Sequence, residues 1–426
     1  MARYNNRKPT VQSAAESRKE REDKAFTLFA DMLIKKLESC QATQWHRPWF
    51  AEGTTAWPKA LYGKPYNGMN ALMLTLLCEK EGYKIPVFAT SDRIFSLNFT
   101  KNADGTRVPA VNEQGEKLPF VHILKGEHSF PVILSCVNIV HNETRERIKW
   151  ADYVRLTPEE QKDYKVYHNR IPYNVFNVDQ TNIKEARPEL YEKLLKENVP
   201  EKVEVKEGET FTFDPIDVMI EKNLWICPIK VKELKAGDSP HYSLKNNEVV
   251  LGEKIQYAKG GHPESWVNDA FHEMIHSTGY KECLDRFKEG REKDSYAREE
   301  LVAEVGAALS CHRYGIPKTI KEDSIPYVQS WLRNLHEKPE FIRTVLKDVK
   351  MATSILDSKV EYVRKEFLGE EEKLDLREED EAALEFDEDG DAHLSQTESV
   401  DPDKKQGEAE GKGESYEEER KHGMRM

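Results

Sequence analysis

The residues most suited to chemistry lie in the segment His272-Glu273-Met274-Ile275-His276. His272 and His276 are four positions apart, so on a helix both imidazoles project from one face. Two imidazole nitrogens one turn apart suit the tetrahedral preference of Zn²⁺. Glu273 could take a proton from a water molecule that the metal activates and pass it to a leaving amine. The spacing therefore predicts a metal-dependent hydrolytic site with Glu273 as the general base.

A zinc site of this kind needs a third ligand, and the segment 296–304 offers one. Glu300 and Glu304 are also four positions apart, in a pattern whose apolar residues recur at helical spacing. We expect Glu300 to bind the metal and Glu304 to accept the second ring N–H of a ligand histidine. The reverse assignment of these two carboxylates stays open. The neighbouring Glu299 is interpreted as a surface carboxylate.

The side chains around the two histidines indicate a buried helix over about 263–278, since most of them are apolar. The alternative is a solvated helix that carries two surface histidines. Two more helices are expected at about 295–314 and 324–357, the second interrupted near Lys338-Pro339. Before them, the segment 241–253 predicts a strand, a polar turn and a second strand. These patterns therefore predict a mainly helical domain with a small sheet.

The first part of the chain predicts a different domain. A helix is expected at about 24–39, a second one ends at Gly82, and short strand-like segments follow, the last two of which could form a hairpin. The fold class is therefore α+β. The expected division is a mobile N-terminal arm at 1–22, a small α+β domain at 23–160, a connector at 161–210, the helical domain at 211–368 and an acidic disordered tail at 369–426.

Net charge separates this tail from the rest of the chain. The 426 residues carry a formal charge of −13, which on its face argues against a nucleic-acid partner. Residues 370–426 hold 22 acidic and 8 basic residues, a net of −14, so the remaining chain carries +1. Residues 1–160 hold 23 basic and 19 acidic residues. The acidity therefore does not exclude binding of DNA by the first domain.

Other features narrow the class of protein. No apolar run is long enough to span a membrane, and the N-terminus lacks the apolar core of a secretory signal. The six cysteines are scattered without a CxxC pair, which indicates a reducing compartment. We therefore expect a cytoplasmic protein without a membrane partner. The sequence does not specify an oligomeric state.

Aromatic and basic residues alternate between residues 45 and 66 of the first domain. A positive surface with exposed rings is what binding of single-stranded nucleic acid requires. The alternative is that these rings belong to the core and that the charges are ordinary surface. In the second domain, His241 and Tyr242 precede a predicted strand and could contact the oxyanion or the substrate, or simply pack on that strand.

At the HExxH and Glu300 positions the sequence resembles gluzincin metallopeptidases, in which a Glu on a following helix is the third zinc ligand. A longer resemblance, over about 24–360, is to ArdC-type antirestriction proteins of mobile elements. It rests on the segments 44–49, 66–70, 173–181, 241–243, 272–279, 299–304 and 330–332. The resemblance implies a domain that binds single-stranded DNA, followed by a zincin-like metallopeptidase domain.

The resemblance and the residues together predict a DNA-associated zinc metallopeptidase that acts in antirestriction or protects incoming single-stranded DNA. The metal ligands are His272, His276 and Glu300, with Zn²⁺ as the expected ion and Mn²⁺ or Co²⁺ as possible substitutes. The peptide substrate is not specified. The candidate DNA contacts are Trp45, Arg47, Trp49, Lys64, Tyr66, Asn67 and Asn70. The alternative is a non-catalytic DNA-binding antirestriction protein whose metal site is structural or vestigial.

Overall fold

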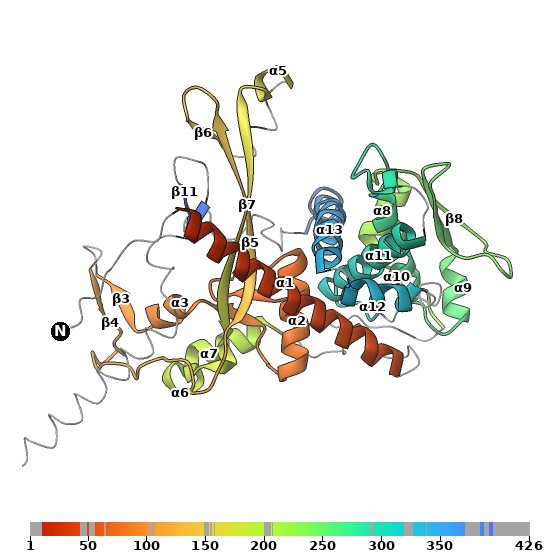
Figure 1. Cartoon of the computed structure of the whole chain (residues 1–426). Coiled ribbons are helices and arrows are strands. Elements are labelled where there is room, and N and C mark those ends of the chain that lie inside the picture. Colours follow the sequence, from red (N-terminus) through yellow and green to blue (C-terminus); the bar gives the residue numbers. More distant parts are fainter. Residues whose placement is uncertain are drawn as a thin grey trace, which may run out of the picture.

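The fold was analysed in a computed structural model of the chain, shown in Figure 1. The structure describes residues 11–42, 49–50, 56–63, 65–102, 106–148, 153, 156, 158–199, 206, 208–289, 293–318, 327–337, 339–370, 384–386 and 392–394. Helices and small sheets are both present, so the predicted α+β class is confirmed. Among the described residues, no helix combines the length and the apolar composition that crossing a bilayer requires.

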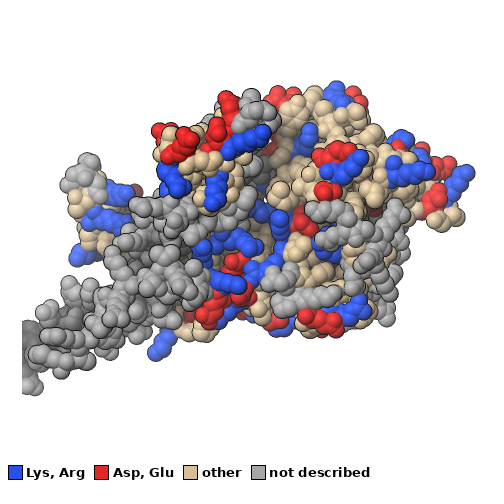
Figure 2. All heavy atoms as spheres, turned by 45° about the horizontal axis from the view of Figure 1, so that its top comes forward, with Lys and Arg blue, Asp and Glu red and all other residues tan. Residues whose placement is uncertain are grey.

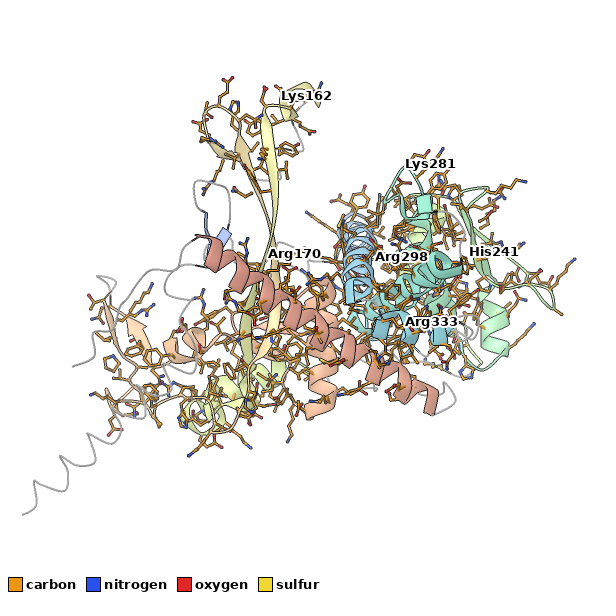
Figure 3. The ribbon with its side chains drawn as sticks, in the orientation of Figure 1. Lys162, Arg170, His241, Lys281, Arg298 and Arg333 are labelled. Carbon is orange, nitrogen blue, oxygen red and sulfur yellow. The ribbon has the colours of Figure 1, made fainter. Side chains whose placement is uncertain are left out.

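The N-terminal half is built on a five-stranded sheet with the order β1-β2-β7-β5-β6. The strands are β1 (Lys59–Ala60), β2 (Val87–Ala89), β5 (Phe130–His141), β6 (Arg147–Ile148) and β7 (Tyr164–Asn177). β5 pairs with β7 along its whole length and with β6 at its end, both antiparallel. The predicted hairpin of β5 and β6 is thus present. The far ends of β5, β6 and β7 project together from the body, with Lys162, just before β7, at the tip and Arg170 of β7 nearer the base (Figures 1 and 3).

The position of β7 changes one predicted boundary. Residues 161–210 were expected to form a connector, but β7 lies in the middle of the sheet, between β2 and β5. The connector therefore does not begin at 161. The alternating apolar residues of this segment, including the buried Ile171 and Val175, are what place it in a sheet. Short helices follow, namely η1 (Val178–Gln180), α6 (Ile183–Ala186) and α7 (Pro188–Glu197).

The first helix, α1 (Val11–Ala42), begins before the predicted residue 24. The residues that were assigned to a mobile arm include Glu22, whose carboxylate accepts a hydrogen bond from Arg343 at 2.7 Å and pairs with Arg170 at 3.0 Å. These contacts join the helix to both halves of the chain. Its apolar face, with Phe29, Leu33 and Leu37 fully buried, lies in the main core.

The described residues of the N-terminal half form five further elements. They are α2 (Gly68–Glu81), α3 (Ser91–Ser96), β3 (Phe99–Lys101), β4 (Arg107–Pro109) and α5 (Pro158–Gln161). α2 ends at Gly82, which takes a left-handed conformation with φ of 72° and whose N–H donates to the carbonyl of Cys78. Asn70 of α2 is buried and bonds both to the carbonyl and to the N–H of Ile133 in β5, which fixes the helix to the sheet.

The C-terminal half is mainly helical, with a three-stranded sheet in the order β8-β10-β9. Its elements are α8 (Asp214–Glu221), β8 (Ile229–Lys232), β9 (His241–Ser243), β10 (Glu248–Gly252), α9 (Lys254–Lys259), α10 (Ser265–Ser277), η2 (Arg286–Glu289), α11 (Lys293–Arg313), α12 (Val328–Glu337) and α13 (Pro339–Phe367). β9 and β10 pair antiparallel across the predicted polar turn. The predicted interruption of the last helical segment separates α12 from α13.

One large core joins the two halves. The main cluster of buried apolar residues runs from α1 and α2 to α10, α11 and α13. Trp57 and Phe50, from the N-terminal half, lie against the ring of His312 in α11, with the Phe50 ring centroid 4.6 Å away. The face drawn in Figure 2 shows basic and acidic side chains interspersed, as expected for a body of net charge +1.

Two short strands of the tail, β11 (Leu384–Phe386) and β12 (Ala392–Leu394), pair antiparallel. The composition of this segment predicts no secondary structure, so these two strands are an exception. The rest of residues 371–426 lies outside the described part of the chain.

The buried His312 predicts a pH dependence of stability. Burial lowers the pKa of His312 from 6.5 to about 4, so the folded protein keeps this imidazole neutral at pH 5 while the unfolded chain protonates it. Proton uptake by the unfolded state then lowers the free energy of unfolding by about 2 kcal/mol between pH 7 and pH 5. In urea unfolding, His312→Phe should lose that part of the pH dependence. An unchanged dependence in this variant would contradict the assignment.

Candidate metal centre

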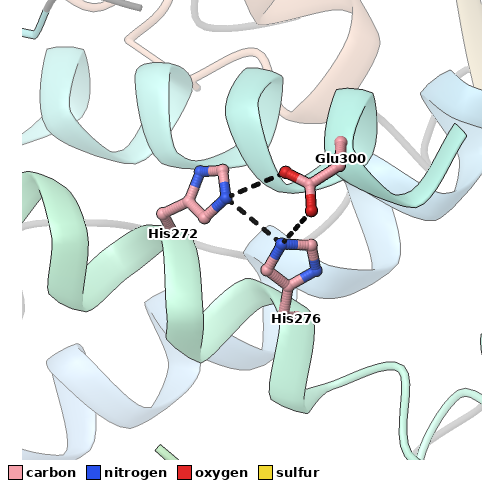
Figure 4. A group of neighbouring side chains, drawn as sticks. All are labelled: His272, His276 and Glu300. Carbon is pink, nitrogen blue, oxygen red and sulfur yellow. Dashed lines mark hydrogen bonds and ion pairs between the residues drawn. The ribbon is translucent and has the colours of Figure 1, made fainter. Parts of the chain in front are cut away.

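Helices α10 and α11 bring three predicted side chains together (Figure 4). His272 Nε2 lies 3.2 Å from His276 Nε2, and Glu300 places one carboxylate oxygen 3.5 Å from the first nitrogen and the other 3.6 Å from the second. Ligand atoms of a tetrahedral ion with bonds of about 2.0–2.1 Å are separated by about 3.3 Å. These separations suit a zinc-sized ion, and the three side chains could hold one.

Close packing of the two helices makes this geometry possible. The α10 face around the histidines is apolar and buried, including Phe271, Met274 and Ile275, so the solvated-helix alternative is wrong. Gly306 of α11 faces Ile275, and an added Cβ there would lie 3.3 Å from three of its side-chain carbons. A residue without a side chain at 306 thus allows α11 to approach α10 closely enough for Glu300 to reach the histidines.

Glu304 lies behind His272, as the spacing predicts. One of its carboxylate oxygens is 3.3 Å from His272 Nδ1, an ion-pair separation without the alignment of a hydrogen bond. The other is 3.1 Å from Lys318 Nζ and accepts a hydrogen bond of 2.9 Å from Trp49 Nε1. Burial raises the pKa of Glu304, but the charges of Lys318 and His272 and the bond from Trp49 outweigh it and lower the pKa to about 2.

Glu299 holds the other histidine, and its interpretation as a surface carboxylate is wrong. It is only 3% exposed, and its Oε1 lies 3.2 Å from His276 Nδ1. Arg286 donates two hydrogen bonds to it, of 2.9 and 2.7 Å, so its charge is balanced inside the core. Burial lowers the pKa of His276, but Glu300 and Glu299 together raise it to about 10. Each candidate ligand histidine thus has a buried carboxylate beside its second nitrogen.

Glu273, the predicted base, is 3% exposed and lies on α10 between the two histidines in sequence. Its charge contributes to raising the pKa of both His276 and Tyr296, which places it in the electrostatic environment of the site. Tyr296 is 44% exposed, and its hydroxyl hydrogen-bonds to Glu300. Tyr296 is not among the site residues predicted from the sequence, although its position one helical turn before Glu300 is a signal for it.

The predicted substrate contacts of β9 lie at the edge of the small sheet. His241 is exposed, its Nδ1 is 2.9 Å from the carbonyl oxygen of Ser239, and it lies to the right of Arg298 of α11 in Figure 3. Tyr242 stacks on Phe287, and its hydroxyl donates to Asn247 at 2.8 Å. Neither side chain has a contact with a candidate metal ligand among the described interactions. Their role in the site stays a prediction.

The predicted DNA contacts divide into three groups. The first group is buried, with exposures of 0% for Trp49, 2% for Tyr66 and 8% for Asn70. These side chains therefore form no stacking surface, and the alternative that they belong to the core is correct for them. Asn67 is partly exposed at the start of α2. Trp45, Arg47 and Lys64 lie outside the described residues.

Trp49 instead links the N-terminal half to the metal centre. Its backbone N–H donates to the carbonyl of Lys318 at 2.8 Å, and its indole holds Glu304. Trp49→Phe removes this donor and leaves the buried carboxylate of Glu304 with fewer partners. The variant should therefore weaken metal binding by about tenfold, the lower end of the loss of affinity expected when a residue that supports a metal ligand is changed. The measurement is metal affinity by competition with a chelator.

Trp57→Phe is the matched control for this prediction, because Trp57 is also a buried indole but donates to the carbonyl of Tyr66 at 2.7 Å. The control variant should keep the wild-type affinity. Equal affinities in the Trp49→Phe and Trp57→Phe proteins would show that the Trp49 bond does not act on the centre.

Two family models match the chain in sequence order. Residues 23–178 match the N-terminal domain of the anti-restriction factor ArdC, and residues 223–347 match a zincin-like metallopeptidase domain. The first model extends through β7, in agreement with the sheet. No curated protein matches the chain.

A solved structure has a similar fold. The metal-free crystal structure of the antirestriction ArdC protein from the R388 plasmid is 21% identical, with a TM-score of 0.50 over 79% of this chain and 97% of that one. The Mn(II)-bound structure of that protein has the same identity and coverage and a TM-score of 0.49. With an ArdC N-terminal domain followed by a zincin-like domain that contains the His272, His276 and Glu300 cluster, the chain belongs to the ArdC-type proteins.

Proposed function

We propose that this protein is a DNA-associated, metal-dependent peptidase that acts in antirestriction or in the protection of incoming single-stranded DNA. The observation that carries the peptidase proposal is the buried triangle of His272, His276 and Glu300. Three protein ligands are typical of catalytic zinc sites, which keep one coordination position for water or substrate, whereas structural sites are closed by four.

Hydrolysis of a peptide requires a base, and Glu273 is the residue we assign to it. A divalent ion bound by the triangle would supply Lewis-acid activation of water and of the peptide carbonyl. The Glu273 carboxylate takes a proton from the attacking water and delivers it to the leaving nitrogen. Tyr296 reaches the solvent and contacts Glu300, so its hydroxyl is our candidate donor to the carbonyl oxygen of the substrate.

The surrounding charges support a role in holding an ion. Arg286 balances Glu299, and Lys318 balances Glu304, so neither carboxylate needs to enter the metal coordination itself. Each is left to orient one histidine. The ion we expect is Zn²⁺, and a donor set of two imidazoles and one carboxylate also accepts Mn²⁺ or Co²⁺.

The partners follow from the two domains. Single-stranded DNA is the partner proposed for the N-terminal domain, and a protein or peptide, whose identity the site does not specify, is the substrate proposed for the second. Protection of incoming DNA places the protein in the cytoplasm. The acidic tail does not oppose this proposal, since the residues before it carry a net charge of +1.

The alternative is a DNA-binding antirestriction protein in which the metal is structural. The low exposure of the ligands favours it, at 2% for His272 and 7% each for His276 and Glu300. An experiment on the full chain separates the two functions, because a shared core joins the halves and a truncation would expose it. The metal-loaded protein is incubated with unfolded protein substrates, with and without single-stranded DNA, and products are identified by mass spectrometry. Metal binding without cleavage in either condition selects the alternative.

A further inference from the structure

Three exposed aromatic rings of the N-terminal half lie on α3 or contact it. Tyr62 is 63% exposed, Phe95 of α3 is 42% exposed and Phe120 is 48% exposed. The ring centroids of Phe95 and Phe120 are 5.7 Å apart, and Phe99 of β3 lies 5.3 Å from Phe95. Large aromatic rings that face solvent as a group are uncommon unless they bind something.

Two cations share a face with this cluster. β3 and β4 pair antiparallel, with Phe99 opposite Pro109 and Lys101 opposite Arg107. Side chains two residues apart on a strand, and those directly opposite on its partner, point to the same side of a ribbon. Phe99, Lys101 and Arg107 are therefore on one face, which is continuous with the rings of Phe95 and Phe120.

The pairing of Lys101 with Arg107 is unfavourable in the free protein. Like charges directly opposite on neighbouring strands destabilise the pair. Both side chains are exposed, and no carboxylate of the described residues forms an ion pair with either. An anion bound between them would relieve the repulsion, so the ribbon is suited to a phosphate group.

Tyr62 extends the cluster on the other side of α3. The guanidinium of Arg93 lies 5.5 Å from the centroid of the Tyr62 ring, and the Tyr62 hydroxyl is 3.3 Å from the hydroxyl of Ser96. This contact holds an exposed ring and a cation side by side at α3, the helix that also carries Phe95. Aromatic faces beside basic side chains are the combination that binds single-stranded nucleic acid without reading its sequence.

We propose that the surface formed by Tyr62, Arg93, Phe95, Phe99, Lys101, Arg107 and Phe120, here called the aromatic ribbon surface, binds single-stranded DNA. Bases stack on Phe95 and Phe120, and the backbone phosphates contact Lys101 and Arg107. The assignment rests on the proposed DNA-binding function and gives it a location. It replaces the buried Trp49 and Tyr66 as stacking residues. In Figure 1 this surface, marked by α3, β3 and β4, lies at the opposite side of the molecule from α10 and α11.

The test uses the full chain, a fluorescent oligothymidine and anisotropy titrations at several salt concentrations. Phe95→Ala combined with Phe120→Ala should weaken binding by about tenfold or more, the effect expected for loss of base stacking. Lys101→Gln combined with Arg107→Gln should weaken binding and lower the slope of log K against log salt by about 1.4, since a single strand contributes about 0.7 per phosphate contact.

The matched control is Tyr362→Ala combined with Phe367→Ala, because these rings form an exposed aromatic pair on α13, 47% and 40% exposed. The control should bind as the wild type does. If the wild type binds and the Phe95 and Phe120 variant binds equally well, the aromatic ribbon surface is not the DNA site, while the DNA-binding function stands. If the wild type binds no single strand at low salt, that function fails as well. Loss of protection against restriction with unchanged DNA binding would assign the surface to a protein partner instead and overturn the proposal.

Discussion

His272→Ala is expected to reduce the metal affinity of the full chain by more than about 100-fold, because loss of an outer-sphere partner alone costs about 10- to 100-fold and a direct ligand contributes more. The reason lies in the donor triangle. His272 Nε2 is 3.2 Å from one partner atom and 3.5 Å from the other, so its removal leaves two donors that cannot enclose a tetrahedral ion. Metal content after dialysis, measured by mass spectrometry together with chelator competition, checks the result.

A second variant distinguishes loss of a metal ligand from a folding defect. Glu300→Gln keeps the side-chain volume while it removes the anionic donor, and we expect it to lose metal nearly as fully. His262→Ala is the control, since the side chain of His262 is 79% exposed and near a different carboxylate, that of Glu264. Stoichiometric, tightly bound metal in a folded His272→Ala or Glu300→Gln protein would exclude the triangle as the metal site.

The candidate centre was accessible to sequence reasoning where the chemistry depends on spacing within one helix. The i, i+4 positions of His272 and His276 determine that both project from the same face of α10, whatever the tertiary fold. The same holds for Glu300 and Glu304 on α11. The apolar neighbours of the histidines further indicated burial, and the turn between β9 and β10 followed from its polar residues.

Contacts between distant segments were not accessible in this way. Glu299 and Glu300 are adjacent, so they point about 100° apart on α11, and only the packing of the helix decides which of them faces Arg286 and His276. The Trp49 bond to Glu304 joins residues 255 positions apart. No local pattern marks such a pair.

The sequence likewise did not determine which aromatic residues of the first domain are exposed. Aromatic and basic residues alternate around Trp49 and Tyr66, yet those rings complete the shared core. The exposed rings of Phe95 and Phe120 come from a short helix and a loop without periodicity, where burial depends on which neighbours arrive from elsewhere in the chain. Composition can thus indicate a stacking function without locating it.

Glu273→Gln is expected to lower peptide hydrolysis by about a hundred- to ten-thousand-fold while the metal content stays unchanged, because a general base contributes about that factor. The glutamine keeps the size of the side chain but cannot accept the proton of the attacking water. Glu273 is not a member of the donor triangle, so the variant separates chemistry from metal binding. Initial rates on a substrate that the wild type cleaves, with metal content measured on the same samples, provide the check.

Glu282→Gln is the control, since that carboxylate is 63% exposed and pairs with Lys281 at 3.2 Å, and its rate should equal that of the wild type. Because Glu273 lies on α10 and the proposed DNA surface on α3, β3 and β4, the variant should bind single strands normally. The effect of Glu273→Gln on protection against restriction then decides between the two proposed functions.

If protection is lost together with hydrolysis, the peptidase activity is required for protection. If the variant protects fully, DNA binding is sufficient and the metal centre serves another purpose. Full hydrolysis by Glu273→Gln would instead show that another group takes the proton.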